Sequence, residues 1–232
     1  MPYRRLPKTD AARLRALKTL LDNNDVYVVR NRFIDWKTLN QAQPLYDKLF
    51  TACGQYRICQ QTQKRHTPEI NKHQHKAIMY VSHFMQVLLM AVERGEIKRS
   101  MLPLYGLQAD ATTLPNIKQT EALSEWGTKV INGEKARLKM GGRPIYNPTI
   151  GMVSTHYDIF KDAFNRHKML MAKTQEALAG IQNLRPKVDQ LLLELWNQIE
   201  AHFEKEPPQV RYEACRKFGI IYYYRRNEPK DD

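Results

Sequence analysis

The sequence predicts an all-α protein: a bundle of long helices built from two related helical hairpins, with short extended segments near residues 26–29 and 220–224. Two observations support this fold class. Apolar residues recur at spacings of three and four over most of the chain, which is the period of one helix face. In addition, 42% of the 232 residues are hydrophobic, enough for a sizeable buried core.

The first helix is expected to begin after Thr9, a good N-cap residue followed by an acidic residue, Asp10. Its apolar face is formed by Leu14, Leu17, Leu20 and Leu21. The segment Val26–Val29 is too short and too rich in β-branched residues for a helix. We expect a strand or an extended crossover there.

The first hairpin is expected between Asp35 and Gly95. An apolar stripe predicts its first helix, with Pro44 at the start or at a kink: Leu39, Ala42, Tyr46, Leu49, Cys53 and Tyr56. Thr67-Pro68-Glu69 then combines an N-cap residue, a proline at the first helical position and an acid. This pattern predicts that a second helix starts there and ends at Gly95.

The middle of the chain contains a shorter helix. Prolines and glycines make residues 97–117 irregular, and a helix is expected from Thr120 to Met140. The turn Gly141-Gly142-Arg143 ends that helix. Its backbone N–H groups could hold a phosphate, but a Walker pattern and a preceding strand are missing, so we interpret the turn as a helix C-cap.

The longest helix is expected after Asn147-Pro148. Its seam has the coiled-coil period: Ile150, Val153, Tyr157, Phe160, Phe164, His167, Met171, Thr174, Leu178 and Ile181. Arg185-Pro186 is expected to begin another helix, which Pro207-Pro208 stops. A short helix over 210–217 and a strand over Ile220–Tyr224 complete the chain, and this strand could pair with Val26–Val29.

The two hairpins resemble each other. Aligning Tyr46 with Tyr157 superimposes the two apolar stripes, and residues 97–107 align with 210–220, both ending in aromatic–Gly–aliphatic. We predict two repeats, an N-terminal one over residues 1–107 and a C-terminal one over 108–232. Their seams could pack as one intertwined four-helix bundle or as two small bundles in a row.

Charge and hydropathy limit the function classes. The net charge of +13 favours contact with polyanions such as nucleic acid, but the basic residues are spread along most of the chain, as in a well-solvated basic surface. The longest apolar runs fall short of the roughly 20 residues that span a bilayer, and the N-terminal segment does not read as a signal peptide. We expect a cytoplasmic protein without a membrane partner.

The sequence offers little catalytic chemistry. Motifs for nucleophilic, nucleotide-dependent or metal-dependent catalysis are missing, and the three cysteines are expected to be reduced core residues. His73 and His75 are two residues apart, which places them about 200° apart around a helix, so they cannot share one metal ion. We expect neither enzymatic activity nor a cofactor or metal, and interpret these histidines as part of a solvated basic face.

One candidate nucleic-acid surface combines cations with aromatic residues near the C-terminus. Its members are Arg211, Tyr212, Arg216, Lys217, Tyr222, Tyr224, Arg225 and Arg226. Cations would bind phosphates while the rings stack on unpaired bases. Alternatively, the tyrosines cover the end of the bundle and the cations only solvate it.

We expect a non-enzymatic structural or interaction protein, which binds an unknown protein partner or itself. Nucleic-acid or other polyanion binding is the alternative function. The three tryptophans, Trp36, Trp126 and Trp196, are expected in the core, although an interface would suit them too.

Three segments between Ser124 and Arg226 also carry a family resemblance. They read GEKARLKMGGRPIYNP, KTQEALAGIQNLRPKVDQLLLELWNQIEAHFE and CRKFGIIYYYRR. In these segments the chain resembles an uncharacterised bacterial family of all-helical proteins. The resemblance implies a helical fold in a bacterial cytosol, and it implies no activity and no site residues.

Overall fold

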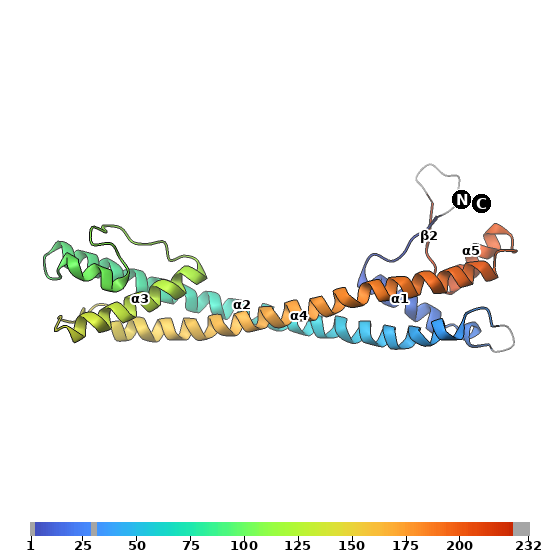
Figure 1. The fold of residues 1–232 in the computed structure, drawn as a ribbon, viewed down its shortest axis with the longest axis horizontal. Coiled ribbons are helices and arrows are strands. Elements are labelled where there is room, and N and C mark those ends of the chain that lie inside the picture. Colours follow the sequence, from blue (N-terminus) through green and yellow to red (C-terminus); the bar gives the residue numbers. More distant parts are fainter. Residues whose placement is uncertain (1–2, 29–31, 225–232) are drawn as a thin grey trace. The chain divides into compact units, whose positions relative to one another are not determined.

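The computed structural model describes residues 3–28 and 32–224, and this part of the chain is helical except for loops and one two-stranded sheet (Figure 1). The predicted all-α fold class is therefore confirmed. The chain divides into two compact units, unit 1 with residues 1–60 and 173–232 and unit 2 with residues 61–172. This division differs from the one predicted at residue 107, because two long helices contribute a segment to each unit.

The long helices correct the prediction of two hairpins. Helix α2 runs without interruption from Trp36 to Glu93 and contains Pro44 and Pro68, and helix α4 runs from Ile150 to His202 and contains Pro186. The hydroxyl of Thr67, expected to cap a new helix, instead donates to the Gln63 carbonyl at 3.0 Å. A proline inside a helix costs about 3 kcal/mol, which the apolar contacts on both sides of it can offset.

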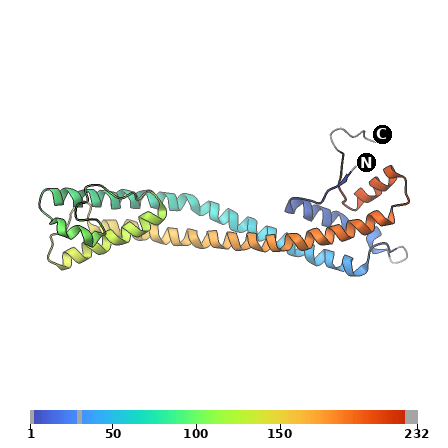
Figure 2. The same cartoon turned by 45° about the horizontal axis from the view of Figure 1, so that its top comes forward.

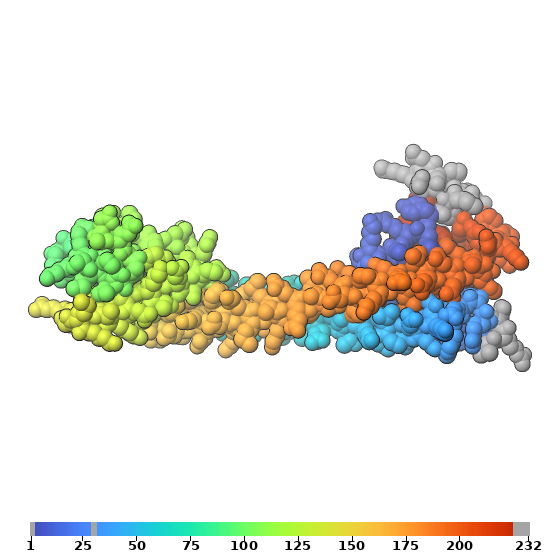
Figure 3. Space-filling model, in the orientation of Figure 1, coloured from blue at the N-terminus to red at the C-terminus, as the bar shows by residue number. Residues whose placement is uncertain are grey.

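Unit 1 pairs residues 36–60 of α2 with residues 173–202 of α4 in antiparallel orientation, and adds helices α1 (Asp10–Leu21) and α5 (Pro208–Lys217) (Figure 2). Its core combines residues from all four helices, including Leu17, Leu49, Leu192, Trp196 and Cys215. In the space-filling view the blue N-terminal segment lies against the orange and red atoms of α4 and α5 (Figure 3).

Two ion pairs join α1 to α4 in unit 1. Arg13 donates to both carboxylate oxygens of Asp189 at 2.7 and 2.8 Å, and Arg185 donates to both of Asp10 at 2.8 Å. The hydrogen bonds from Arg185 hold the pKa of Asp10 below its ordinary value despite partial burial. Bidentate pairs of this kind fix the orientation of α1 as well as its position.

The short extended segments differ in part from expectation. Asn24–Tyr27 forms a 3-10 turn, η1, with the Asn23 side chain accepting from the N–H of Asp25. Val28 is extended, and Val29 lies outside the described residues. Strand β2 (Tyr222–Tyr223) forms within the predicted C-terminal strand, but it pairs with β1 (Tyr3–Arg4) rather than with residues 26–29.

Unit 2 pairs residues 61–93 of α2 with residues 150–172 of α4, also antiparallel, and adds the 3-10 segment η3 (Arg99–Tyr105) and helix α3 (Thr120–Lys139) (Figures 1 and 2). The core includes Phe84, Leu88, Tyr105, Val130 and Phe160. The predicted apolar seam of α4 supplies the residues from Val153 to Phe164 in this core.

The close approach of α3 to α4 in unit 2 depends on Gly127. A Cβ at this position would lie 2.3 Å from the ring of Tyr157, whose hydroxyl donates to the Ser124 carbonyl at 2.6 Å. The ring is therefore held in place and cannot move aside easily. Gly127 is therefore required for close packing between α3 and α4.

We expect Gly127→Ala to lower the free energy of unfolding by about 1–3 kcal/mol, because overpacking outweighs the higher helix propensity of alanine. Urea unfolding followed by circular dichroism measures this. Gly151→Ala is the matched control, since its nearest neighbour atom would be 3.8 Å away. Equal or greater stability of the Gly127→Ala protein would contradict the packing described.

Candidate functional site

The aromatic rings of the candidate nucleic-acid surface pack largely against other residues of unit 1. Tyr212 is buried, and the ring of Tyr222 lies 4.9 Å from it. The hydroxyl of Tyr222 donates to Glu200 at 2.6 Å, and burial together with Glu200 and Cys215 raises its pKa. The Arg211 guanidinium lies over the Tyr212 ring, 5.0 Å from its centroid. The packing of these rings leaves Tyr212 inaccessible to bases and Tyr222 partly exposed.

The cations of this surface are divided. Arg216 and Lys217 are exposed, whereas Arg211 is half-buried, as is Tyr224. Arg225 and Arg226 lie outside the described residues. The described part favours the alternative interpretation, in which tyrosines cover the end of the helices and cations solvate it.

The histidine-rich stretch lies on α2. His66 Nδ1 is 3.1 Å from Glu69 Oε2, its acidic neighbour three residues along the helix. In the described part of the chain, no group of three or more His, Cys, Asp or Glu side chains is placed to hold a metal ion. No helix there combines the length and apolarity that crossing a bilayer requires.

The most distinctive polar cluster is a triad in unit 2, formed by Tyr105 of η3 and by Glu134 and Arg137 of α3. Arg137 donates to Glu134 through Nε at 2.9 Å and Nη2 at 2.7 Å, and Nε also donates to the Tyr105 hydroxyl at 2.9 Å. The Tyr105 hydroxyl in turn donates to Glu134. All three side chains are buried, with Glu134 fully inaccessible. A buried charge pair is tolerated when its geometry is good and its hydrogen bonds are made.

Burial and the hydrogen bonds of the triad change the pKa values of Tyr105 and Arg137. Desolvation, followed by the neighbouring Glu134 carboxylate, raises the pKa of Tyr105 above its ordinary value. Burial alone would lower the pKa of Arg137, but the hydrogen bonds with Glu134 and Tyr105 outweigh it and raise that pKa. Arg137 therefore keeps its charge in the interior.

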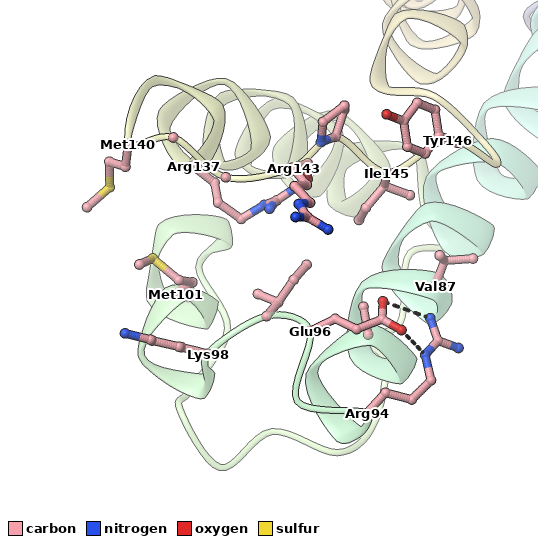
Figure 4. Close-up of a pocket in the computed structure, with 15 residues that line it drawn as sticks. Val87, Arg94, Glu96, Lys98, Met101, Arg137, Met140, Arg143, Ile145 and Tyr146 are labelled. Atoms are coloured by element: carbon pink, nitrogen blue, oxygen red, sulfur yellow. Dashed lines mark hydrogen bonds and ion pairs between the residues drawn. The ribbon is translucent and has the colours of Figure 1, made fainter.

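Arg137 of the triad, together with Met140, lines one wall of a cavity of about 650 Å³ in unit 2 (Figure 4). The end of α2, the turn at 94–98, η3 and the loop between α3 and α4 make up the remaining walls. Arg94 is paired with Glu96 at 2.7 Å, and the Arg143 guanidinium points into the pocket. The sequence pattern gave one hint of this place, namely the turn Gly141-Gly142-Arg143.

That turn acts as the helix C-cap and not as a backbone anion site. The N–H of Gly141 donates to the Leu138 carbonyl at 3.0 Å, and the N–H of Gly142 to the Arg137 carbonyl at 3.1 Å. Gly141 has φ of 85°, the left-handed conformation usual at this position. Cations around the cavity, rather than backbone groups, are available to a ligand.

Unit 1 has a different feature, an apolar groove between α2 and α4. The exposed fractions of the Phe50 and Ile58 side chains are 60% and 65%. Other residues lining the groove are Thr51, Ala52, Gly54, Gln55, Cys59, Lys173, Glu176, Ala177 and Gly180. Nothing lies within 4 Å of a Cβ built on Gly54 or Gly180, so open space adjoins both glycines.

Comparison with known proteins does not identify the chain. No protein-family model matches it, and neither a curated protein nor a solved structure does. The resemblance to a bacterial helical family stays a prediction.

The raised pKa of Tyr105 predicts a loss of stability at alkaline pH. Above about pH 10 a tyrosine ionises in the unfolded chain while Tyr105 stays protonated in the folded protein. The unfolded state then binds fewer protons, so the free energy of unfolding falls by up to about 1.4 kcal/mol per pH unit for this group. We expect Tyr105→Phe to flatten this slope in urea titrations between about pH 8 and 11.

Tyr146→Phe is the control, because it removes a hydroxyl from a ring that is 78% exposed. Identical slopes for the wild type and Tyr105→Phe, with Tyr105→Phe folded, would show that the triad does not hold this proton.

Proposed function

We propose that the chain is a non-enzymatic interaction protein that self-associates through the apolar groove of unit 1. The observation that supports this most is the stripe Phe50, Gly54 and Ile58 on α2, in which two large exposed apolar side chains flank a glycine. Residues four apart lie on the same helix face. Exposed apolar stripes of this kind are typical of protein interfaces.

A second copy of the chain fits the stripe because the stripe is self-complementary. In a two-fold symmetric contact the same patch occurs on both sides, and with the axis perpendicular to α2 the two α2 helices cross at Gly54 in antiparallel directions. Phe50 and Ile58 are equally distant from Gly54, so Phe50 of one copy would face Ile58 of the other. The missing side chain at Gly54 allows the two helices to approach closely.

The charged residues at the rim of the groove also suit a second copy of the chain. Lys173 and Glu176 line the groove on α4 and are both exposed. These two residues carry opposite charges, so the rim of one copy can form complementary pairs with the rim of another. Since each chain carries a net charge of +13, salt should strengthen this association by screening the repulsion between copies.

We also infer that the chain arose by internal duplication, because buried residues of α2 and α4 match at one constant offset. The offset from Tyr46 to Tyr157 also pairs Ile70 with Ile181, Ala77 with Val188, Phe84 with Leu195, Met85 with Trp196 and Leu88 with Ile199, and all of these further residues are buried. The left-handed glycines Gly106 and Gly219 follow the short helices after α2 and α4.

The duplication supplies an internal comparison for the groove. The same offset places Lys161, Asn165 and Met169 opposite Phe50, Gly54 and Ile58. The repeat on α4 is therefore polar at two of the three positions. An apolar stripe is not required by the architecture, which favours a role in association for the one on α2.

Nucleic-acid binding remains the alternative function, on the basis of net charge. The packing of Tyr212 and Tyr222 argues against stacking on bases, but Arg216 and Lys217 remain exposed. A cytoplasmic location is part of the proposal and follows from the sequence expectation alone.

Sedimentation equilibrium tests the proposed association. We expect a monomer–dimer equilibrium in the micromolar range that tightens when salt is raised from about 50 to 200 mM. Polyanion binding, measured by fluorescence polarisation with single-stranded DNA, would instead weaken steeply over the same range. A chain that stays monomeric at about 100 µM in high salt would rule the proposal out.

Ile58→Glu is expected to weaken the dimer at least about tenfold, because it removes the apolar contact with Phe50 and places a charge within the interface. Met169→Glu is the matched control, since Met169 is 63% exposed and occupies the corresponding position on α4. If both substitutions weaken association equally, the groove of unit 1 is not the interface.

A further inference from the structure

We propose that the cavity of unit 2 binds a small amphiphilic anion, in which a phosphate or carboxylate group is attached to an apolar body. This site is separate from the groove of unit 1 and does not depend on self-association.

The charges around the cavity do not cancel. Arg94 is neutralised by Glu96 at 2.7 Å, and Arg137 by Glu134 at 2.7 Å. Within the described chain, neither Arg143 nor Lys98 makes a side-chain hydrogen bond or ion pair. Arg143 points into the pocket, whereas Lys98 lies at its rim (Figure 4). The cavity therefore has an excess of positive charge, which an anionic group would neutralise.

The triad positions the backbone of the loop that carries Arg143 before any ligand arrives. Nη2 of Arg137 donates to the carbonyl of Arg143 at 2.7 Å, which fixes the loop against α3. Gly142 makes this approach possible, because a Cβ there would lie 2.7 Å from Nη1 of Arg137. A loop held in this way loses less entropy on binding.

The rest of the lining suits an apolar body. Val87 and Ala91 of α2, Ile97, Met101 and Ile145 line the space beside the cations. Ligand pockets typically have mostly apolar walls with a few polar groups that set orientation. An aliphatic or aromatic group attached to an oxyanion would contact both kinds of wall.

Unit 1 has a smaller cavity in the corresponding place, of about 410 Å³, between the end of α4, α5 and the loop before α2. Aromatic groups fill that region: Phe33 stacks on His202 at 4.4 Å and meets Phe218 edge-on at 5.5 Å. In unit 1, packed aromatic side chains are thus sufficient to close this end of the helices. The buried Glu134 and Arg137 of unit 2 are not needed merely to close the end of the helices, which favours a role in binding.

Binding can be located by NMR of the full chain with ¹³C-methyl-labelled methionine, because Met101 and Met140 line the cavity and Met169 does not. The probes are phenyl phosphate, phenylacetate and, as the neutral control, benzyl alcohol. We expect phenyl phosphate or phenylacetate to shift the Met101 and Met140 signals in a saturable way and to leave Met169 unchanged. The stronger of the two probes identifies the anionic group.

Arg143→Gln is expected to weaken binding of that probe at least about tenfold, and Arg143→Lys less. Lys135→Gln, on the exposed side of α3, is the matched control and should bind as the wild type does. Benzyl alcohol binding as tightly as the anions, equal affinity of Arg143→Gln and wild type, or unchanged Met101 and Met140 signals at about 10 mM probe would each overturn the proposal.

Discussion

The apolar faces of α2 and α4 are the constraint on which the rest of the structure depends. Each face continues through sequence signals that usually end a helix, and each must be covered along its length. Within each unit, a segment of the other long helix supplies this cover, running antiparallel. The short helices then close what remains open, α1 and α5 in unit 1, and η3 and α3 in unit 2.

The two units fasten their short helices by different means. In unit 1 the bidentate pairs Arg13–Asp189 and Arg185–Asp10 bind α1 to α4 from a partly exposed position. In unit 2 the triad of Tyr105, Glu134 and Arg137 is buried between η3 and α3. Exposed pairs add little stability, whereas a buried pair depends on each of its partners being present. Loss of one triad member should therefore cost more stability than loss of one partner from a pair in unit 1. Arg137 of the triad also lines the cavity.

Much of the fold could be predicted from local patterns. The apolar period identified the helical segments, and Thr9 caps α1 as expected, its side chain accepting from the N–H of Ala12 at 3.2 Å. The helix boundary predicted at Thr67-Pro68 was wrong. A capping pattern reflects only local preference, whereas packing on both sides decides whether a helix continues. Trp196 is buried as expected, but Trp36 is 48% exposed. The burial of an apolar residue near a helix start depends on which neighbouring segments pack against it, and the local sequence does not show this.

The candidate sites were harder to predict from the sequence than the helices were. Glu134 and Arg137 are an ordinary pair three residues apart on a helix, and only contact with Tyr105, far away in the chain, makes them a buried triad. Likewise, the rings of Tyr212 and Tyr222 suggested a stacking surface because a one-dimensional pattern does not show that they contact each other. The charges were evident from composition, but their pairing was not.

Packing on both sides of Pro68 holds α2 together as one continuous helix. Backbone NMR of residues 61–75, with ¹³Cα shifts and amide hydrogen exchange, can detect this continuity. We expect helical shifts throughout and slow exchange on both sides of Pro68. Coil-like shifts and rapid exchange around Thr67 would contradict it, and would restore the helical hairpin that the local sequence pattern favours.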